Sequence, residues 1–445
     1  MADAAHRILD LAEHALSTSF PLRVRAWDGS EAGPSGPPVL VIRRRRALRR
    51  LLWRPGELGL VRAWVAGDLD IEGDLYTALD HLSGLFWDRG ERDPSATAVP
   101  ATTAETLRRA RGILRDPATY RLIRSALTLA GPGLPPSPPP EEVRRRSGIA
   151  HTKRRDKDAI AHHYDVGNDF YETVLGPSMV YSCAVFPEPD TTLEQAQYAK
   201  LDLVCRKLQL REGQRLLDVG CGWGSMVLHA VKHYGVRATG ITLSTEQAAY
   251  ARKRVAEAGL TDRIEIRVQD YRDVADGPYD AISSIGMAEH VGSERYLEYA
   301  RTLYGLLRPG GRLLNHQIAR RPLADEETYR IDEFIDRYVF PDGELAPVGS
   351  TVSWLEQAGF EARDMEALRE HYARTLRAWV RNLEAGWDKA VAVTSPGRAR
   401  VWRLYMAASA VSFERNRIGV NQVLAVRTAA DGLSDLPPTR TAWLS

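Results

Sequence analysis

RLLDVGCGWGS, the stretch from Arg215 to Ser225, decides the fold of this chain. An apolar run typical of a buried strand leads straight into a glycine turn, and a helical pattern from Ser225 to Tyr234 begins at that turn. Gly220, Gly222 and Gly224 would let backbone N–H groups approach a ligand because no Cβ atom stands in the way. On its own, a G-x-G-x-G pattern favours an ordinary tight turn between a strand and a helix.

Three more strand-like runs surround this turn at the spacing of βαβ units. They cover Arg237 to Ser244, Arg263 to Tyr271 and Tyr279 to Gly286. Strands that alternate with helices predict an α/β fold, here a doubly wound, Rossmann-like parallel sheet. Because ligands of such sheets bind at the carboxyl ends of the strands, the glycine turn becomes a predicted cofactor site.

The composition is ordinary for a globular protein. With 445 residues, of which 44% are apolar and 27% charged, the chain has room for two or three domains. No apolar run approaches the roughly 18 residues that cross a bilayer, and the N-terminus lacks the apolar core of a signal peptide, so we expect a cytoplasmic protein. Cys183, Cys205 and Cys221 have neither disulfide-framework nor zinc spacing, so reduced thiols are expected.

A basic element stands out against the small net charge of +2. Between Arg43 and Arg54, the sequence RRRRALRRLLWR interleaves arginines with Leu and Trp, which predicts a basic, amphipathic surface element. Anionic lipid headgroups are its natural partner, whereas no motif for nucleic acid accompanies it. A solvated helix face that only supports a small domain explains the pattern equally well.

Three regions are predicted along the chain. Residues 1–130 form a small N-terminal α+β module associated with lipid or membrane, with a strand-like run at Val39 to Arg43, the turn-rich GDLDIEGDL and a helix over 104–130. Residues 131–155 contain GPGLPPSPPP and a basic sequel, which predict a stiff, exposed linker. Residues 156–445 form the catalytic domain.

Eight motifs in this last region appear in order and carry a family resemblance. They are AHHYDVGNDFY (Ala161 to Tyr171), MVYSCAVF (Met179 to Phe186), LLDVGCGWG (Leu216 to Gly224), GITLSTEQ (Gly240 to Gln247), GMAEHVG (Gly286 to Gly292), LLNHQI (Leu313 to Ile318), HYARTLRAW (His371 to Trp379) and FERNRIGVNQ (Phe413 to Gln422). The set resembles the cyclopropane-fatty-acyl-phospholipid synthase family, which includes mycolic acid cyclopropane synthases and fatty-acyl methyltransferases. GDLDIEGDL resembles the N-terminal module of the longer members. The resemblance implies a class I methyltransferase fold.

The cofactor that the resemblance implies is S-adenosylmethionine. Dinucleotide enzymes place an acidic residue about 20 positions beyond the glycines, but here the corresponding strand ends in Thr242 and Leu243, as it does in this family. The implied cofactor residues are Tyr181, Ser182, Gly220, Gly222, Gly224, Thr242, Leu243, Gln247 and Asp270. Asp270 would bind the adenine amino group, while Tyr181 and Ser182 would close over the methionine end. Alternatively, Asp270 caps a helix and Tyr181 belongs to the core.

A bound bicarbonate ion serves as the base in this family, and the resemblance implies its contacts here. They carry over to Cys183, Glu289, His316, Ile318 and Tyr372. Glu289 would accept a hydrogen bond from the bicarbonate hydroxyl; His316, the Tyr372 hydroxyl and the backbone N–H groups of Cys183 and Ile318 would orient the ion. A structural histidine in a strand and a carboxylate at a helix start are the alternatives for His316 and Glu289.

Aromatic side chains are the second expected part of the active site. Tyr164, Phe170, Trp379 and Phe413 would line an acyl tunnel and stabilise a cation, although packing explains aromatic residues in motifs at least as well. No metal site is predicted, because the adjacent His162 and His163 lack the spacing of a ligand pair.

The predicted reaction is methyl transfer from S-adenosylmethionine to the cis double bond of an unsaturated acyl chain of a membrane phospholipid, through a carbocation. Loss of a proton from the added methyl group gives a cyclopropane, and loss from a neighbouring carbon gives a methylene branch. Ser409, where many relatives have Cys, tilts the expectation slightly towards the methylene product. A methyltransferase for a soluble natural product and a non-catalytic lipid carrier are the alternatives. The expected partners are the phospholipid and an anionic membrane, at the inner face of the cell membrane; a homodimer is left open.

Overall fold

The computed structural model describes residues 3–92, 117–143, 152–153, 155–156 and 166–441. Contacts divide the chain into two compact units. The N-terminal unit comprises Met1–Val143 with Pro396–Val411, and the C-terminal unit comprises Arg144–Ser395 with Ser412–Ser445. The domain boundaries predicted at residues 130 and 155 stay a prediction. The sequence did not indicate that Pro396–Val411 would group with the N-terminal residues. Residues 144–151 and 154 of the predicted linker and residues 104–116 of the predicted helix lie outside the described residues.

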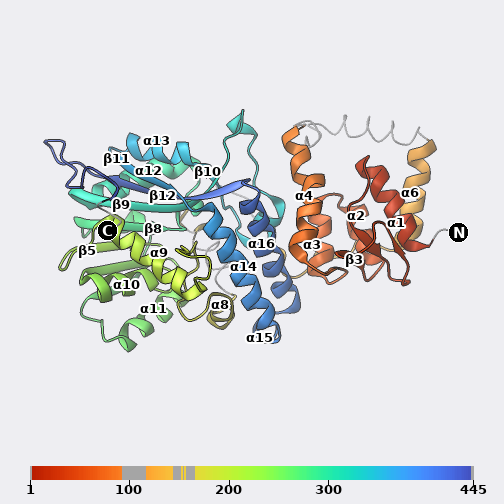
Figure 1. Cartoon of the computed structure of the whole chain (residues 1–445), viewed down its shortest axis with the longest axis horizontal. Coiled ribbons are helices and arrows are strands. Elements are labelled where there is room, and N and C mark those ends of the chain that lie inside the picture. Colours follow the sequence, from red (N-terminus) through yellow and green to blue (C-terminus); the bar gives the residue numbers. More distant parts are fainter. Residues whose placement is uncertain (1–2, 93–116, 144–151, 154, 157–165, 442–445) are drawn as a thin grey trace. The chain divides into compact units, whose positions relative to one another are not determined.

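The N-terminal unit is an α+β arrangement around one four-stranded sheet (Figure 1). Its strands run in the order β2-β1-β3-β4, with β1 and β3 parallel. The strands are β1 (Arg23–Arg25), β2 (Glu31–Ala32), β3 (Val39–Ile42) and β4 (Leu69–Glu72). The helices are α1 (Ala4–Leu16), α2 (Arg46–Trp53), α3 (Glu57–Val65), α4 (Leu75–Arg92), α6 (Pro117–Ala130) and most of α16 (Pro396–Glu414). The strand-like run at Val39 is thus confirmed, and GDLDIEGDL contains β4 between two glycine turns.

The basic element forms α2, but part of it faces inwards. Arg50 is only 6% exposed, and it donates with Arg46 to the carboxylate of the fully buried Asp68. A buried carboxylate needs such partners, because an unpaired charge away from water is costly. Arg49 and Arg50 also donate to backbone oxygens of residues 131–140, which form neither helix nor strand, as predicted. The element therefore has a structural role within this unit.

The C-terminal unit is built on an eight-stranded sheet. The order is β11-β12-β9-β8-β5-β6-β7, and β10 pairs with β9. Strands β5 to β9 are parallel, whereas β12 and β11 join antiparallel at one side. The strands are β5 (Arg215–Val219), β6 (Arg237–Thr242), β7 (Ile264–Val268), β8 (Tyr279–Ile285), β9 (Leu307–Arg320), β10 (Ala346–Pro347), β11 (Glu361–Ala367) and β12 (Ile418–Val426). The predicted Rossmann-like parallel sheet is confirmed.

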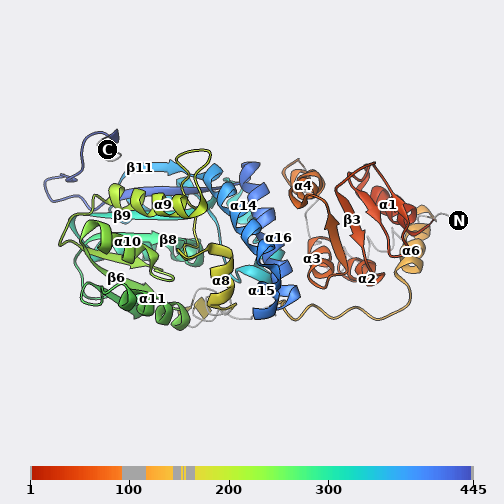
Figure 2. The same cartoon turned by 60° about the horizontal axis from the view of Figure 1, so that its bottom comes forward.

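Helices cover both faces of this sheet (Figure 1). The helices of this unit are α8 (Asn168–Leu175), α9 (Leu193–Leu208), α10 (Ser225–Tyr234), α11 (Thr245–Glu257), α12 (Tyr296–Leu306), α13 (Val348–Gln357), α14 (Arg369–Ala385) and α15 (Trp387–Val393). Short turns of helix are η2 (Tyr271–Asp273), η3 (Ala288–His290), η4 (Ser293–Arg295), η5 (Glu326–Thr328) and the π-helical η6 (Ile335–Val339). Figure 2 shows α9, α10 and α11 together in front of the strands.

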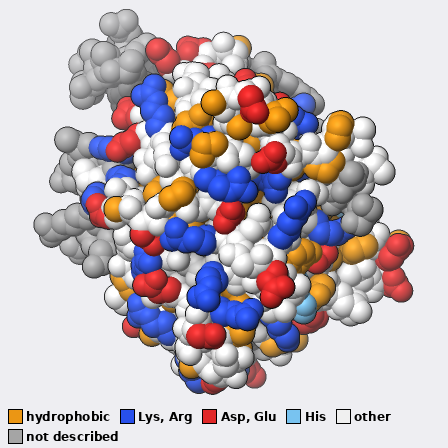
Figure 3. Space-filling model, turned by 90° about the vertical axis from the view of Figure 1, so that its left-hand side faces the viewer, with side chains coloured by type: hydrophobic (Ala, Val, Ile, Leu, Met, Phe, Trp, Pro, Cys, Tyr) orange, Lys and Arg blue, Asp and Glu red, His pale blue; other side chains and the backbone are white. Residues whose placement is uncertain are grey.

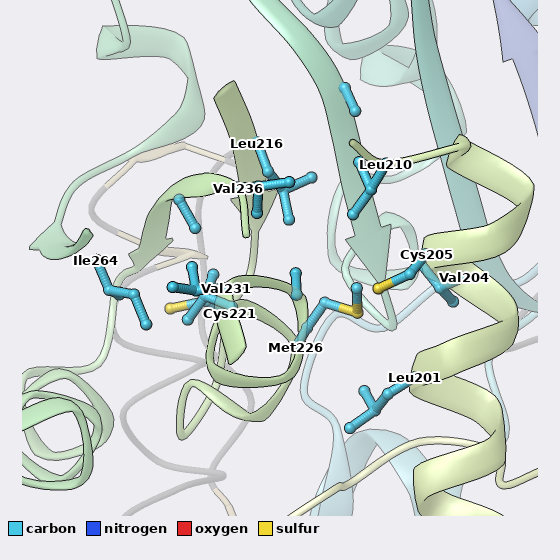
Figure 4. Close-up of a cluster of buried hydrophobic side chains, with 14 of the residues drawn as sticks. Leu201, Val204, Cys205, Leu210, Leu216, Cys221, Met226, Val231, Val236 and Ile264 are labelled. Carbon is cyan, nitrogen blue, oxygen red and sulfur yellow. The ribbon is translucent and has the colours of Figure 1, made fainter. Parts of the chain in front are cut away.

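Side chains along each strand point alternately to the two faces of the sheet, so each face has its own hydrophobic core. Leu216 packs with α9 and α10, whereas its neighbour Leu217 packs with α12. Figure 4 shows the first of these cores, with Cys205 on α9 pointing towards Met226 on α10. Because both faces of the sheet are buried, the central strands are nearly continuous apolar runs. These apolar runs are the pattern from which the strands were predicted.

Within the described part of the chain, no helix is long and apolar enough to cross a bilayer. Ser409 lies half-buried in α16, in the segment grouped with the N-terminal unit, and its effect on the product stays a prediction.

Candidate functional site

The glycine turn joins β5 to α10, and its three glycines all have positive φ. Two of them are needed for packing: a Cβ atom at Gly220 would lie 3.1 Å from Met287 Cγ, and one at Gly224 would lie 3.1 Å from Ala251 Cβ. A Cβ atom at Gly222 would meet only Gln247 Nε2, at 4.0 Å. Gly222 is therefore the position at which a missing side chain leaves room for a ligand.

A pocket lies at the carboxyl ends of β5, β6, β7 and β8. Eight of the nine predicted cofactor residues line it, namely Tyr181, Ser182, Gly220, Gly222, Thr242, Leu243, Gln247 and Asp270. Gly224 does not line the pocket, in keeping with its contact to α11. The structure thus brings the predicted cofactor residues together at the topological position where such sheets bind ligands.

Thr242 and Gln247 form one hydrogen-bonded unit beside the glycine turn. The Thr242 hydroxyl donates to Gln247 Oε1 at 2.9 Å, and Ser244, the N-cap of α11, accepts from the Gln247 backbone N–H. These bonds leave Gln247 Nε2 directed at the turn, where it can donate to a ligand hydroxyl.

Asp270 both lines the pocket and caps the short helix η2. Its carboxylate accepts two side-chain hydrogen bonds from Arg272, at 2.8 and 2.6 Å, and Arg272 also pairs with Asp156. Burial opposes ionisation, but the hydrogen bonds from Arg272 outweigh it and hold the pKa of Asp270 below its usual value. Asp270 is consequently an ionised acceptor, and its capping role coexists with its place in the pocket.

Tyr181 belongs to an aromatic cluster and also lines the pocket. Its ring lies 5.3 Å from that of Trp379 and 5.6 Å from that of Tyr171, centroid to centroid. Tyr181 therefore packs in the core, as the alternative interpretation of the sequence proposed, and it also lines the pocket next to the buried Ser182.

Glu289 lies in η3, directly after β8, and its side chain reaches β9. Its Oε1 accepts the backbone N–H of Ile318 at 2.8 Å, while Oε2 is buried and has no hydrogen-bond partner among the described residues. Burial raises the pKa of Glu289 to about 7. The Ile318 N–H, expected to hold a bicarbonate ion, is occupied by Glu289 in this structure.

His316 lies on β9, two residues before Ile318 and on the same side of the strand. Burial, with Lys200 and Lys207 adding to the effect, lowers the pKa of His316 well below its usual value, so the ring is neutral at pH 7. Gln422 Nε2 lies 3.2 Å from His316 Nδ1 and can only donate, which places the ring proton on Nε2. His316 Nε2 is buried and has no partner within the described residues.

Cys183 and Tyr372 are brought to the same region through Leu368. The Leu368 carbonyl accepts the Tyr372 N–H and lies 3.6 Å from Cys183 Sγ, and the Leu368 N–H donates to Val420, which pairs with Ile318. Burial raises the pKa of Cys183 well above its usual value, so this thiol is no nucleophile.

None of the five predicted base residues lines the cofactor pocket, although its lining residue Gly286 donates to the His316 carbonyl at 2.8 Å. The base cluster, defined as Glu289, His316, Gln422, Cys183 and Tyr372, therefore adjoins the pocket rather than forming its wall.

The aromatic residues predicted for an acyl tunnel are packed tightly. The Tyr372 ring lies 4.8 Å from Phe413 and 6.0 Å from Trp379, and Phe170, Trp379 and Phe413 are at most 1% exposed. Tyr164, His162 and His163 lie outside the described residues. Among the residues that the structure describes, no group of three His, Cys, Asp or Glu side chains could hold a metal ion.

Three residues of the site were missed from the sequence. Gln422 was part of a quoted motif but had no role assigned, and its partner became visible only through the pairing of β12 with β9. Lys200 and Asp218 also line the pocket. Lys200 could have been found from its position in the sequence. It lies four residues from both Ala196 and Val204, so it is a charged residue on the apolar face of a predicted helix.

Comparisons with known proteins identify the family of this chain. Residues 151–423 match the family model described as mycolic acid cyclopropane synthetase. A probable fatty acid methyltransferase of Mycobacterium tuberculosis is 45% identical over 95% of both chains, and one of Pseudomonas putida is 40% identical over 95% of this chain and 96% of its own. The crystal structure of mycolic acid cyclopropane synthase CmaA1 complexed with SAH and CTAB has a TM-score of 0.57 and 34% identity, covering 60% of this chain and 97% of that one. This chain therefore belongs to the mycolic acid cyclopropane synthetase family of S-adenosylmethionine-dependent methyltransferases.

Proposed function

We propose that the protein transfers the methyl group of S-adenosylmethionine to the cis double bond of an unsaturated acyl chain in a membrane phospholipid. The observation that carries the proposal is the buried pair of unpartnered polar atoms, Glu289 Oε2 and His316 Nε2, next to a pocket lined by the predicted cofactor residues. Natural proteins rarely leave buried polar atoms unpaired, and these two belong to residues of the predicted site, so we take them as the position of a reacting or bound group. The names of the two full-length relatives support a fatty acyl substrate.

The residues around this pair suit a reaction through a carbocation. An alkene is a weak nucleophile, so the chain must hold it in line with the methyl donor and exclude water. The rings of Tyr181, Trp379, Tyr372 and Phe413 form a continuous aromatic series from the cofactor pocket to the base cluster, with centroids 4.8 to 6.0 Å apart. Ring faces attract a cation without offering it a nucleophilic lone pair.

The base cluster suits the removal of a proton from that cation. With a pKa of about 7, Glu289 is partly ionised at neutral pH and can accept a hydrogen bond at Oε2. Neutral His316 donates from Nε2, with its orientation fixed by Gln422. The donor and acceptor fit a small oxyanion such as bicarbonate, which would supply the base; the Ile318 N–H would join its ligands only after release from Glu289.

Loss of the proton from the added methyl group yields a cyclopropane, and loss from a neighbouring chain carbon yields a methylene branch. Both products gain one carbon from the donor. Expression in a host rich in unsaturated phospholipid, followed by lipid extraction and mass spectrometry, tests the proposal. We expect phospholipid acyl chains heavier by one CH₂ unit, and fragmentation places the carbon. Unchanged lipids combined with a methylated soluble product would favour the natural-product alternative, and binding of lipid without methylation would favour the lipid carrier.

Access to an acyl chain requires contact with the bilayer, and we assign this contact to the end of α2. Leu52 and Trp53 are 39% and 60% exposed at the C-terminal end of α2, and the exposed Arg44 and Arg45, which precede the helix, form no ion pair with any described residue. An exposed Trp in the same basic element as these arginines suits the interface of an anionic membrane. On the face of the molecule in Figure 3, basic and acidic side chains are intermingled, so that face offers no comparable surface.

Sedimentation with anionic vesicles tests this assignment. Replacing both Arg44 and Arg45 with Gln should weaken binding by about 1 kcal/mol for each charge, and binding of the wild type should fade as salt is added. The matched control replaces Arg301 and Arg321, two exposed arginines of the C-terminal unit, with Gln. Equal binding of both double variants at low salt would contradict the assignment, which places the protein at the inner face of the cell membrane.

A further inference from the structure

The loop that carries Glu289 has no side-chain cap of its own. It runs from Gly286, directly after β8, to Arg295, directly before α12, and it contains η3 and η4. The N-cap residues of η3, η4 and α12 are Met287, Gly292 and Arg295, and none of them makes a capping hydrogen bond from its side chain to a described residue. Since the first N–H groups of a helix need acceptors, this loop depends on acceptors from other segments.

Glu344, which is 51 residues beyond Ser293 in the chain, contacts this loop at two points. Its Oε2 accepts the Ser293 backbone N–H at 3.1 Å, and its Oε1 accepts the Ser293 hydroxyl. The backbone N–H of Glu344 donates to the Glu289 carbonyl at 2.9 Å. A carboxylate at the first turn of a helix is favourable, because it meets the N–H groups that have no partner within the helix. Glu344 thus caps η4 from another segment and also holds the backbone of Glu289.

Glu344 is itself fixed to β9, the strand that carries His316. β10 begins two residues after Glu344 and pairs in parallel with the end of β9. The Leu345 carbonyl accepts a hydrogen bond at 2.9 Å from Nε of Arg320, the last residue of β9. Glu344 therefore joins the loop of Glu289 to the strand of His316.

We propose that Glu344 is a positioning residue, which holds Glu289 where its Oε1 accepts the Ile318 N–H and its Oε2 is kept away from water. Glu344 does not line the cofactor pocket, so it would act on the reaction only through Glu289. The inference rests on the proposed role of Glu289 in the base cluster. A carboxylate that only stabilises α12 is the competing interpretation, because η4 leads directly into that helix.

Denaturant unfolding tests the positioning without any assay of turnover. The free-energy difference between the protein and its Glu289→Gln variant is measured from pH 4 to pH 8, first with Glu344 intact and then in the Glu344→Ala background. A loosened loop would admit water to Glu289, so the change of this difference with pH should shrink to less than about half. Of the other ionisable groups here, burial lowers the pKa of His316 and raises the pKa of Tyr296 and Tyr299, so all three stay neutral.

Turnover on vesicles of unsaturated phospholipid is the second readout. Glu344→Ala should lower kcat by about tenfold or more, because a displaced reacting group is costly, and it should leave KM and the calorimetric affinity for S-adenosylhomocysteine unchanged. Adding Ser293→Ala to Glu344→Ala should cause little further loss, because the two residues act through one contact. Glu344→Gln, which keeps one acceptor oxygen, is the milder variant and should change both readouts in the same direction.

The matched control is Asp280→Ala, at the opposite end of β8. Asp280 is also a half-buried carboxylate that accepts a backbone N–H, that of Arg215 at 2.8 Å. This variant should lower stability but change neither kcat nor the pH dependence attributed to Glu289. An unchanged pH dependence in both Glu344 variants would overturn the inference and leave Glu344 a helix cap. If the pH dependence shrinks as expected but the wild type methylates no phospholipid, the proposed function fails and the positioning of Glu289 stands.

Discussion

Replacing Glu289 with Gln should reduce turnover and stabilise the fold at the same time. Gln retains an oxygen that can accept the Ile318 N–H, but it cannot become an anion at the position of Oε2. We expect turnover to fall by roughly a hundredfold or more, the scale of losing a general acid–base group. Affinity for S-adenosylhomocysteine should not change, because Glu289 does not line the pocket.

The stability effect follows from the pKa of the same group. Its folded-state pKa is raised from 4.5 to about 7, so the folded state holds the proton more tightly than the unfolded state does. The wild type therefore loses stability as the pH rises from about 4.5 to about 7, whereas the Gln variant has no such loss at this position. At about 1.36 kcal/mol for each pKa unit, the difference approaches about 3 kcal/mol above pH 7.

Denaturant unfolding of both proteins between pH 4 and pH 8 measures this difference directly. Other groups titrate equally in both proteins, so the change with pH in their free-energy difference isolates Glu289. A constant difference across this range would refute the claim that Glu289 is an ionisable group held in a dry site. A loss of calorimetric affinity for S-adenosylhomocysteine would show that Glu289 is a cofactor ligand.

Two further substitutions test the pocket and the base cluster. Gly222→Leu should abolish measurable binding of S-adenosylhomocysteine because the leucine side chain would occupy the space of the ligand. Gly222→Ala, which has the same backbone strain at φ +52°, should retain most of the affinity. Equal affinities of the two variants would show that the glycine turn does not contact the cofactor. Gln422→Met should lower turnover by about 10- to 100-fold without changing cofactor affinity, and ¹⁵N spectra of the His316 ring should show a changed tautomer balance; an unchanged ring spectrum would contradict the positioning role.

The parts of the site predicted from sequence depend on local signals. The strand, glycine turn and helix from Arg215 to Tyr234 are contiguous, and their hydrophobic pattern and glycines specify them without distant partners. Thr242 and Asp270 follow because each lies at the end of a recognisable strand. The carboxyl ends of parallel strands meet at one edge, so local patterns were sufficient to collect these residues in one pocket.

Long-range pairing determined what the sequence did not show. Gln422 faces His316 because β12 lies antiparallel to β9, a register between residues 106 apart in the chain. No local pattern specifies that register. Likewise, the inward direction of Arg50 depends on Asp68, a partner supplied by a different element, so a basic helix with one buried face looked entirely exposed in the sequence.

In the motif LLNHQI, one strand separates polar residues that are paired within the fold from the predicted site residue His316. Asn315 and Gln317 face α12 and α13, where their amides bond to each other, to Tyr296 and Tyr299 of α12 and to Thr351 of α13. His316, between them, points to the opposite face and retains an unpartnered Nε2. Buried polar groups that pair within the fold stabilise it, whereas an unpartnered buried nitrogen needs a partner from outside the fold. The alternation along β9 therefore places the paired amides on one face of the strand and the unpartnered Nε2 of His316 on the other.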